Sequence, residues 1–435
     1  MNFEKGKALQ QISHKLIPGG AHTYAKGDDQ YPELAPPFLV KGKGSHVWDA
    51  DGNEFIEYGM GLRAVTLGHA YEPVVQAASK QMLLGNNFTR PAPIESECAQ
   101  KLLGLIAGGE MVKFAKNGSD VTTAAVKLAR AFTGRDRVAV CAEHPFFSVD
   151  DWFIGSTTMA AGIPEVVRKL TVKFHYNDLN SIQALFDTYP GEIACLVMEP
   201  EKEEPPAHDF LLEAQKLCHK NGALLILDQL ITGFRFNLHG AYKEYGVLPD
   251  LCTFGKGLGN GFAIAALVGK REIMELGGLK HNKERVFLLS TTFGAESHAL
   301  AAAIEIMRIY EQEPVIEHLY RQGNRLIEGI RHLVEQLHLE GHFGTMGRPC
   351  NLVYFTRDEQ KKPSQIFRTL FLQETIKRGL LMPSLVVSYS HTDRDIDHTI
   401  ERIGEALHVY RKALDEGADK YLVGQPSKPA LRQYN

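Results

Sequence analysis

The chain has 435 residues, of which 44% are hydrophobic and 23% are charged, an ordinary composition for a soluble globular protein. This length exceeds what one small core requires, so we expect a large domain and a smaller one. The formal net charge of −4 argues against a nucleic-acid partner, and no apolar run has the length of a membrane helix. We therefore expect neither a nucleic-acid nor a membrane partner.

Six cysteines occur without a CxxC pair or a regular spacing: Cys98, Cys141, Cys195, Cys218, Cys252 and Cys350. This usage favours reduced thiols, and the polar first sixteen residues lack the apolar core of a signal peptide. We expect a cytoplasmic protein. The 18 histidines are scattered and no HExxH motif occurs, so we predict no metal site.

In chain order, residues 44–58 first predict a β-hairpin that turns at Asp51-Gly52. Residues 117–134 then predict a capped helix. Asn117 to Asp120 offer N-cap side chains, apolar residues recur at helical spacing, and Gly134 is a suitable stop.

Four apolar runs of strand length follow, at residues 193–198, 223–227, 251–254 and 263–268. Helical patterns, such as the one over residues 210–220, separate these runs. Continuous apolar strands that alternate with helices indicate a parallel sheet covered on both faces. Ligands bind such sheets at the carboxyl ends of the strands, and Asp228 directly follows one run.

The C-terminal third predicts helices over residues 299–310, 364–377 and 393–414 and strands over 351–355 and 385–389. We interpret segments 1–70 and 326–435 as the two parts of one smaller α+β domain. Residues 71–325 form the large domain in this division, and residues 425–435 are expected to be extended.

Two residues of the large domain could carry chemistry. Asp228 could cap a helix, form a buried salt bridge or bind a cationic ring nitrogen, because a buried carboxylate needs a partner. Lys256 lies among four glycines between residues 255 and 261 and is either a loop lysine or a reactive amine. This loop does not match the glycine patterns of nucleotide-binding loops.

Two segments carry weaker signals for a phosphate. The predicted helix start at Asn117 to Asp120 presents backbone N–H groups, as every capped helix does. The hydroxyls of Ser290, Thr291 and Thr292 could bind phosphate, although capping the following helix is the simpler interpretation.

The order and spacing of these segments resemble the class III aminotransferases that depend on pyridoxal phosphate (PLP), and most closely their glutamate-1-semialdehyde 2,1-aminomutase branch. The resemblance extends from residue 17 to residue 393. The motifs that carry it are Trp48 to Asn53, Leu67-Gly68-His69, Asn117 to Asp120, Leu128-Ala129-Arg130, Glu199-Pro200, Leu227 to Arg235 and Phe254-Gly255-Lys256.

The resemblance implies the fold type I of PLP-dependent transferases, a mostly parallel mixed sheet covered by helices beside a smaller α+β domain. It also implies a role for each matching residue. Lys256 would form the imine with PLP and shuttle the proton, and Asp228 would keep the ring nitrogen protonated. Gly118 and Ser119 would bind the phosphate, Leu230 would lie against the ring, and Thr291 would reach the phosphate of the neighbouring subunit in a homodimer.

Several positions depart from the family pattern. Gln229 stands where the family usually has a glutamate, and Ile231 replaces the glutamine of amine- and ornithine-type relatives, which favours the aminomutase-like branch. The tyrosine that stacks on the ring is absent, so Phe146 or Phe147 is the candidate for this contact. Arg63, Glu199 and Gln229 are candidates for contacts with the substrate, and Arg63 could instead form a surface salt bridge.

Two reactions compete. The departures at 117–120, 143–148 and 229 favour an aminotransferase that moves an amino group between a small-molecule donor and a carbonyl acceptor, with a sugar or polysaccharide precursor as one expected class. The alternative is an intramolecular transfer by glutamate-1-semialdehyde 2,1-aminomutase. A non-catalytic PLP-binding protein is a remote alternative, because both Lys256 and Asp228 are present.

Overall fold

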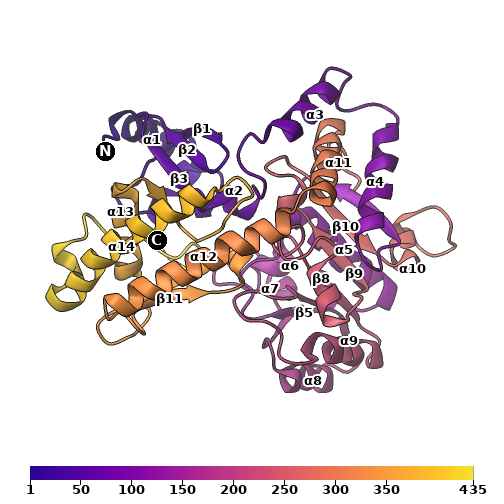
Figure 1. Cartoon of the computed structure of the whole chain (residues 1–435). Coiled ribbons are helices and arrows are strands. Elements are labelled where there is room, and N and C mark those ends of the chain that lie inside the picture. Colours follow the sequence, from indigo (N-terminus) through magenta and orange to yellow (C-terminus); the bar gives the residue numbers. More distant parts are fainter. Residues whose placement is uncertain (435) are drawn as a thin grey trace. The chain divides into compact units, whose positions relative to one another are not determined.

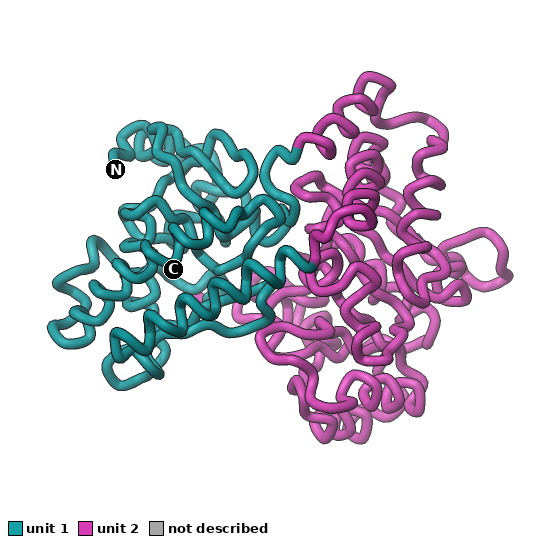
Figure 2. Tube along the Cα trace, viewed as in Figure 1, with its two compact units in different colours: residues 1–71, 317–432 teal, residues 72–316, 433–435 magenta. Residues whose placement is uncertain are grey.

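The computed structural model describes residues 1–434 and divides the chain into two compact units (Figures 1 and 2). Unit 1 contains both chain ends, Met1–Tyr71 and Glu317–Arg432, and unit 2 is built from Glu72–Ile316. The domain division expected from the sequence, with segments 1–70, 71–325 and 326–435, stays a prediction.

Unit 2 contains a seven-stranded sheet in the order β4-β10-β9-β8-β7-β5-β6. Its strands are β4 (Met111–Ala115), β5 (Arg137–Cys141), β6 (Thr171–Phe174), β7 (Ile193–Met198), β8 (Leu224–Asp228), β9 (Leu251–Phe254) and β10 (Ala265–Gly269). Strands β6, β5, β7, β8 and β9 run parallel to their neighbours. The predicted mostly parallel sheet is therefore confirmed.

The fourth predicted run differs in direction from the others. Strand β10 pairs antiparallel with both β9 and β4, which makes the sheet mixed. Only a short loop joins β9 to β10, and a parallel connection needs a crossover of a dozen or more residues. The number of residues between β9 and β10, rather than the composition of the two runs, therefore sets the direction of β10.

Helices cover the sheet of unit 2 because its central strands are buried along their whole length. Helix α5 (Gly118–Thr133) packs its apolar stripe against β9, β10 and β7, and the shared core includes Val121, Leu128, Val197 and Ile226. The other helices are α3 (Glu72–Met82), α4 (Pro93–Leu105), α6 (Asp151–Ile154), α7 (Glu165–Arg168), α8 (Leu179–Thr188), α9 (Phe210–Lys220), α10 (Arg271–Met274) and α11 (Ser297–Gln312).

Unit 1 joins the two ends of the chain in one four-stranded sheet, ordered β1-β2-β3-β13. Strands β1 (Leu39–Lys43), β2 (His46–Asp49) and β3 (Glu54–Glu57) are antiparallel, and the β2–β3 pair is the hairpin predicted around Asp51-Gly52. Strand β13 (Leu380–Leu381) adds in parallel to β3. Strands β11 (Phe343–Met346) and β12 (Val353–Thr356) form a separate pair.

One strand prediction in unit 1 is wrong. Residues 385–389 form no strand and make a single isolated bridge, between Leu385 and Leu352, while the short strand lies earlier, at β13. The run is apolar because it is buried, and burial alone does not distinguish a strand from a packed loop.

The helices of unit 1 are α1 (Glu4–Leu16), α2 (Met60–Arg63), α13 (Gln365–Lys377), α14 (Asp393–Glu416) and most of α12 (Val315–Gln336). The helices predicted over residues 364–377 and 393–414 correspond to α13 and α14, whereas the other three were not predicted. Ser364 caps α13 and Thr392 caps α14, each accepting a backbone N–H from the first turn, as their sequence positions predict.

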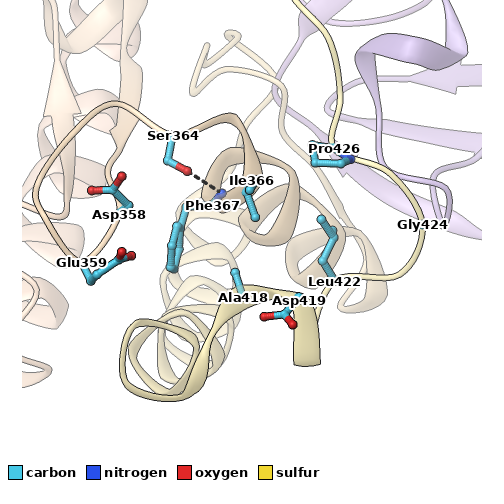
Figure 3. Close-up of a pocket in the computed structure, with 10 residues that line it drawn as sticks. All are labelled: Asp358, Glu359, Ser364, Ile366, Phe367, Ala418, Asp419, Leu422, Gly424 and Pro426. Atoms are coloured by element: carbon cyan, nitrogen blue, oxygen red, sulfur yellow. Dashed lines mark hydrogen bonds between the residues drawn. The ribbon is translucent and has the colours of Figure 1, made fainter.

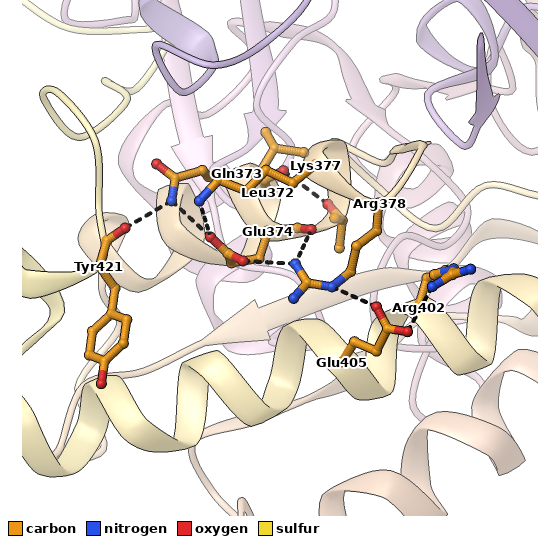
Figure 4. Close-up of polar contacts among 9 residues, drawn as sticks. Leu372, Gln373, Glu374, Lys377, Arg378, Arg402, Glu405 and Tyr421 are labelled. Atoms are coloured by element: carbon orange, nitrogen blue, oxygen red, sulfur yellow. Dashed lines mark hydrogen bonds and ion pairs between the residues drawn. The ribbon is translucent and has the colours of Figure 1, made fainter. Parts of the chain in front are cut away.

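A polar network fastens the segment after α14 to α13 (Figure 4). The buried Gln373 donates to the Tyr421 carbonyl at 2.9 Å and accepts from the Val423 N–H at 2.8 Å. Beside it, Arg378 forms ion pairs with Glu374 at 2.7 Å and with Glu405 at 3.0 Å. The segment therefore has a defined path over α13.

The same region of unit 1 contains an open pocket of about 400 Å³ (Figure 3). Three carboxyl side chains line it together with apolar residues: Asp358, Glu359, Asp419, Ile366, Phe367, Leu422 and Pro426. Ser364, which also lines the pocket, uses its hydroxyl oxygen to cap α13.

No helix among residues 1–434 is long and apolar enough to cross a membrane. The same residues contain no group of three or more His, Cys, Asp or Glu side chains that could hold a metal ion. All six cysteines are free and buried, so they serve as small core residues.

Candidate active site

Asp228 is the last residue of β8 and lies at the carboxyl end of the parallel strands. Its side chain is only 3% exposed, and its Oδ1 accepts the Leu230 N–H at 2.9 Å and the Thr253 hydroxyl at 3.3 Å. Among the described residues, Oδ2 has no hydrogen-bond partner. Burial raises the pKa of Asp228 to about 6. A cation in contact with Oδ2 would lower this pKa and stabilise the ionised form.

Lys256 begins the short helix η5 (Lys256–Leu258) directly after β9, the strand next to β8. Its backbone φ is +46°, a left-handed conformation that few residues other than glycine adopt. The positive charge of Lys256 lies close enough to lower the pKa of both Asp228 and Glu199. Asp228 and Lys256, which are 28 positions apart in the sequence, are therefore close in space.

Leu230 packs against two glycines that flank the candidate residues. A Cβ on Gly118 would lie 2.3 Å from Leu230 Cδ1, and a Cβ on Gly255 would lie 2.6 Å from Leu230 Cδ2. Both distances are shorter than any real contact, so a side chain at either position would force Leu230 to move. Through Leu230, the start of α5, the loop after β8 and the Lys256 loop meet at one place.

The start of α5 has the features of an anion site. Asn117 caps the helix by accepting the Asp120 N–H at 3.1 Å, as predicted. The N–H groups of the first helical turn remain, and the helix dipole favours negative charge here. Ser119 Oγ accepts the Val149 N–H at 3.0 Å, which leaves its hydroxyl hydrogen available to donate to an anion.

The loop after β5 distinguishes the two phenylalanines. Phe147 is 1% exposed and belongs to the core under α5, where its carbonyl accepts the Thr122 hydroxyl at 2.7 Å. Phe146 is 47% exposed, and its ring meets the ring of Phe153 edge-on, with ring centres 5.9 Å apart. Phe146 is thus the one of the two whose ring face is open to a ligand.

Glu199 and His144 adjoin Asp228 on the side of β7. His144 is buried, and its Nδ1 accepts the Glu199 N–H at 3.0 Å, so this nitrogen carries no proton. Burial, followed by the charge of Lys202, lowers the pKa of His144 to about 3, and the ring is neutral. His144 was not among the predicted site residues, since an isolated histidine after a strand carries no distinguishing signal.

Gln229 is fully buried beside Asp228. Its Oε1 accepts the Ala241 N–H at 2.7 Å, whereas its Nε2 has no hydrogen-bond partner among the described residues. Through this bond, Gln229 holds the short helix η4 (Ala241–Tyr245), and its side chain lies in the protein interior. This geometry supports a structural role for Gln229 rather than the substrate contact considered above.

Two further predicted site residues have the following surroundings. Thr291 is exposed in a loop of unit 2. It makes no contact with the described site residues named above. Arg63 belongs to unit 1, where its Nε donates to the buried Asn351 at 3.0 Å. Arg63 ends α2, whose four residues Met60 to Arg63 all have positive φ and form a left-handed turn.

Comparison with known proteins decides the family. The model of the family "Aminotransferase class-III" matches residues 26–407. The chain belongs to the class III aminotransferase family. This class III chain is an enzyme, and its cofactor is pyridoxal phosphate.

Relatives with different printed activities have similar identity. The chain is 33% identical to the glutamate-1-semialdehyde 2,1-aminomutase of Acetivibrio thermocellus, covering 95% of this chain and 99% of that protein. It is 30% identical to the 3-aminobutyryl-CoA aminotransferase of Cloacimonas acidaminovorans, with the same coverage. The PLP-containing FumI protein of Sphingopyxis sp. MTA144 superposes with a TM-score of 0.87 at 27% identity, covering 98% and 99% of the two chains.

The site of this class III enzyme fits pyridoxal phosphate in three respects. The buried Asp228 has one oxygen without a partner, which suits a cationic ring nitrogen. The amine of Lys256 is near that carboxylate. The start of α5 suits the phosphate, and Gly118 allows Leu230 to approach this helix start. The donor set therefore matches the cofactor that the family uses.

Proposed function

We propose that this class III enzyme is an aminotransferase that moves an amino group from one small molecule to the carbonyl group of another. The observation that carries the proposal is Asp228, a buried carboxylate with one unused oxygen beside the Lys256 amine. When bound, pyridoxal phosphate supplies an electron-accepting ring that weakens the C–H bond next to the donor nitrogen.

Each residue has a task that follows from its position. Lys256, at the start of η5, would hold the cofactor covalently and then move a proton at its Nζ. Asp228 keeps the ring nitrogen charged by offering Oδ2. Gly118 and Ser119 bind the phosphate through N–H and O–H groups, and Leu230 contacts one ring face. We assign the stacking contact to Phe146, because Phe147 is part of the core.

The competing function is the intramolecular transfer of glutamate-1-semialdehyde 2,1-aminomutase, which the relative at 33% identity favours. The relative at 30% identity is a transferase with separate partners, so identity alone does not separate the two. Arg63 and Glu199 remain candidates for contacts with the substrate. A sugar or polysaccharide precursor remains the acceptor class that we propose to test first.

We also propose a cytoplasmic homodimer. The six buried, free cysteines suit a reducing compartment. Thr291 lies on an exposed loop between Phe287 and Phe293, whose side chains are 69% and 56% exposed. Exposed large apolar side chains mark protein interfaces, and the position suits a contact of Thr291 with a second copy of the chain.

A screen of half-reactions tests the function. The PLP-loaded enzyme is mixed with single amino donors, and the loss of the cofactor absorption band is followed. The proposal predicts that at least one simple amino acid converts the enzyme and that a separate carbonyl compound, including keto-sugars, restores it. A response only to glutamate-1-semialdehyde or diaminovalerate would instead establish the aminomutase. A colourless protein that takes up no PLP, or a Lys256→Ala variant with an unchanged band, would contradict both.

A further inference from the structure

Glu199 is a second buried carboxyl next to Asp228. Met198 pairs with Leu227 in the parallel ladder of β7 and β8, so Glu199 and Asp228 follow side by side at the carboxyl ends of the two strands. The side chain of Glu199 is only 6% exposed. Its carboxyl group has no hydrogen bond or ion pair within the described residues. An ionised carboxylate without a partner is costly to bury, so the site disfavours a charge at Glu199.

The hydrogen bonds decide which of the two carboxyl groups carries a proton. Asp228 accepts two hydrogen bonds at Oδ1, from the Leu230 N–H and the Thr253 hydroxyl, and both stabilise its anion. The Glu199 carboxyl accepts none. Burial and then the charge of Asp228 raise the pKa of Glu199 to about 7, while that of Asp228 rises to about 6. The hydrogen bonds and the electrostatic surroundings therefore both indicate that Glu199 is the more readily protonated group.

The other groups that face Glu199 leave this balance unchanged. Lys256 is near both carboxyl groups and can compensate one negative charge. Lys202 also lowers the pKa of Glu199, but it is paired with Glu203 at 3.2 Å. Glu203 itself acts in the opposite direction to Lys202 and raises the pKa of Glu199. The imidazole of His144 and the phenol of Tyr176 are neutral.

We propose that Glu199 is a positioning residue that works as a neutral acid beside an ionised Asp228, so that the site holds a single anion next to Lys256. This inference rests on the proposed function of Lys256 and Asp228. His144 holds the backbone of Glu199 in place through Nδ1 and, being neutral, adds no charge.

Ionisation of Glu199 has a defined consequence for the reaction. It places a second negative charge beside Lys256 and favours the protonated form of the amine. A protonated amine cannot accept the proton of the amino donor, so the rate falls as Glu199 loses its proton. Glu199 thus sets an alkaline limit to activity.

The first experiment titrates the absorption band of the PLP-loaded enzyme with pH in the absence of substrate. In the wild type we expect a transition of this band that reports the nitrogen of Lys256. We expect its midpoint to shift by about one pH unit or more in Glu199→Gln, because one pKa unit is the usual effect of a close charge. Glu199→Met, which is also neutral, gives the same shift. Equal midpoints in the wild type and both variants would refute the proposal.

Glu201→Gln is the matched control. Glu201 lies two residues away and is equally buried, but its carboxylate accepts the hydroxyl of Tyr245. We expect the midpoint of this variant to equal that of the wild type. A shift as large as that of Glu199→Gln would show that any buried charge in this segment has the same effect, and the specific role of Glu199 would be lost.

The second experiment needs no cofactor. Infrared difference spectra of the apoenzyme, recorded over the range from about pH 5 to about pH 9, report the C=O stretch of protonated carboxyl groups. We expect a band that titrates in the wild type and is absent in Glu199→Gln. Its persistence in the variant would overturn the inference even if PLP binds normally. Conversely, loss of the band together with a failure to bind PLP would reject the proposed function and leave the protonation of Glu199 standing.

Discussion

Gly118 and Leu230 are in such close contact that a methyl group on Gly118 would lie 2.3 Å from Leu230 Cδ1. This contact joins the anion-binding start of α5 to the loop that follows Asp228. The pair therefore offers a direct test of how the cofactor site is assembled.

Gly118→Ala is expected to weaken PLP binding about tenfold or more, because an overpacked contact of this kind costs about 1–3 kcal/mol. Fluorescence titration of the apoenzyme with PLP measures the effect. Leu230→Ala in the same chain removes the obstructing methyl groups and should restore part of the affinity. Gly104→Ala is the control, since nothing lies within 4 Å of a Cβ at that position. Additive effects of the two substitutions would contradict the contact.

Asp228→Asn should retain PLP and lose turnover by roughly 100-fold or more, because a neutral amide no longer holds the ring nitrogen in its charged form. The backbone fold should persist, since the amide oxygen can still accept from Leu230 and Thr253. Single-turnover kinetics with an amino donor give the rate. A variant that turns over at nearly the wild-type rate would show that Asp228 has another task.

Phe146 and Phe147 should respond to truncation in opposite ways. Phe147→Ala opens a cavity in the core under α5 and is expected to lower the free energy of unfolding by about 3–5 kcal/mol. Phe146→Ala removes a half-exposed ring and should change stability little while weakening PLP binding. Chemical denaturation of the apoenzyme and PLP titration separate the two effects. Reversed results would exchange the roles that we give to these residues.

Thr291→Ala tests the proposed sharing of the phosphate site in a homodimer. Light scattering should give a dimer for both proteins, and the variant should bind PLP more weakly, by about tenfold or more, since one hydrogen bond to a charged group contributes about 1.5–3 kcal/mol. Ser290→Ala, one residue earlier on the same exposed loop, is the control. A monomeric wild-type enzyme that is fully active would remove the basis for this prediction.

His46 and Asp395 predict how the stability of unit 1 depends on pH. His46 Nε2 lies 3.3 Å from Asp395 Oδ1, and this hydrogen bond raises the pKa of His46. Although burial acts in the other direction, hydrogen bonds from His46 and Thr392 hold the pKa of Asp395 below its usual range. The stability that Asp395 contributes is lost as the pH falls through its folded-state pKa. The stability that His46 contributes is lost as the pH rises through the folded-state pKa of His46.

The free energy of unfolding, measured with urea at a series of pH values, should therefore be greatest where both His46 and Asp395 are charged. At lower and at higher pH, this pair should account for a loss of about 1 kcal/mol. Asp395→Asn should flatten the curve. An unchanged curve in that variant would mean that other groups control the dependence.

The sequence alone determined the cofactor and much of the sheet. The apolar runs at 193–198 and 251–254 became strands with the predicted bounds, and α5 begins and ends where Asn117 and Gly134 predict. Such local signals suffice because burial and capping depend on residues that are near in the chain. The resemblance of the segments around Asp228 and Lys256 to one family was confirmed by the comparisons.

Only the tertiary structure decided how these segments act together. The direction of β10, the loop at 385–389, the burial of Phe147 and the inward use of Gln229 all depend on partners distant in the sequence. The pairing of Glu199 with Asp228 is the clearest case. They lie 29 positions apart along the chain, yet two adjacent parallel strands end with their carboxyl groups side by side, away from water, where burial disfavours a charge on both.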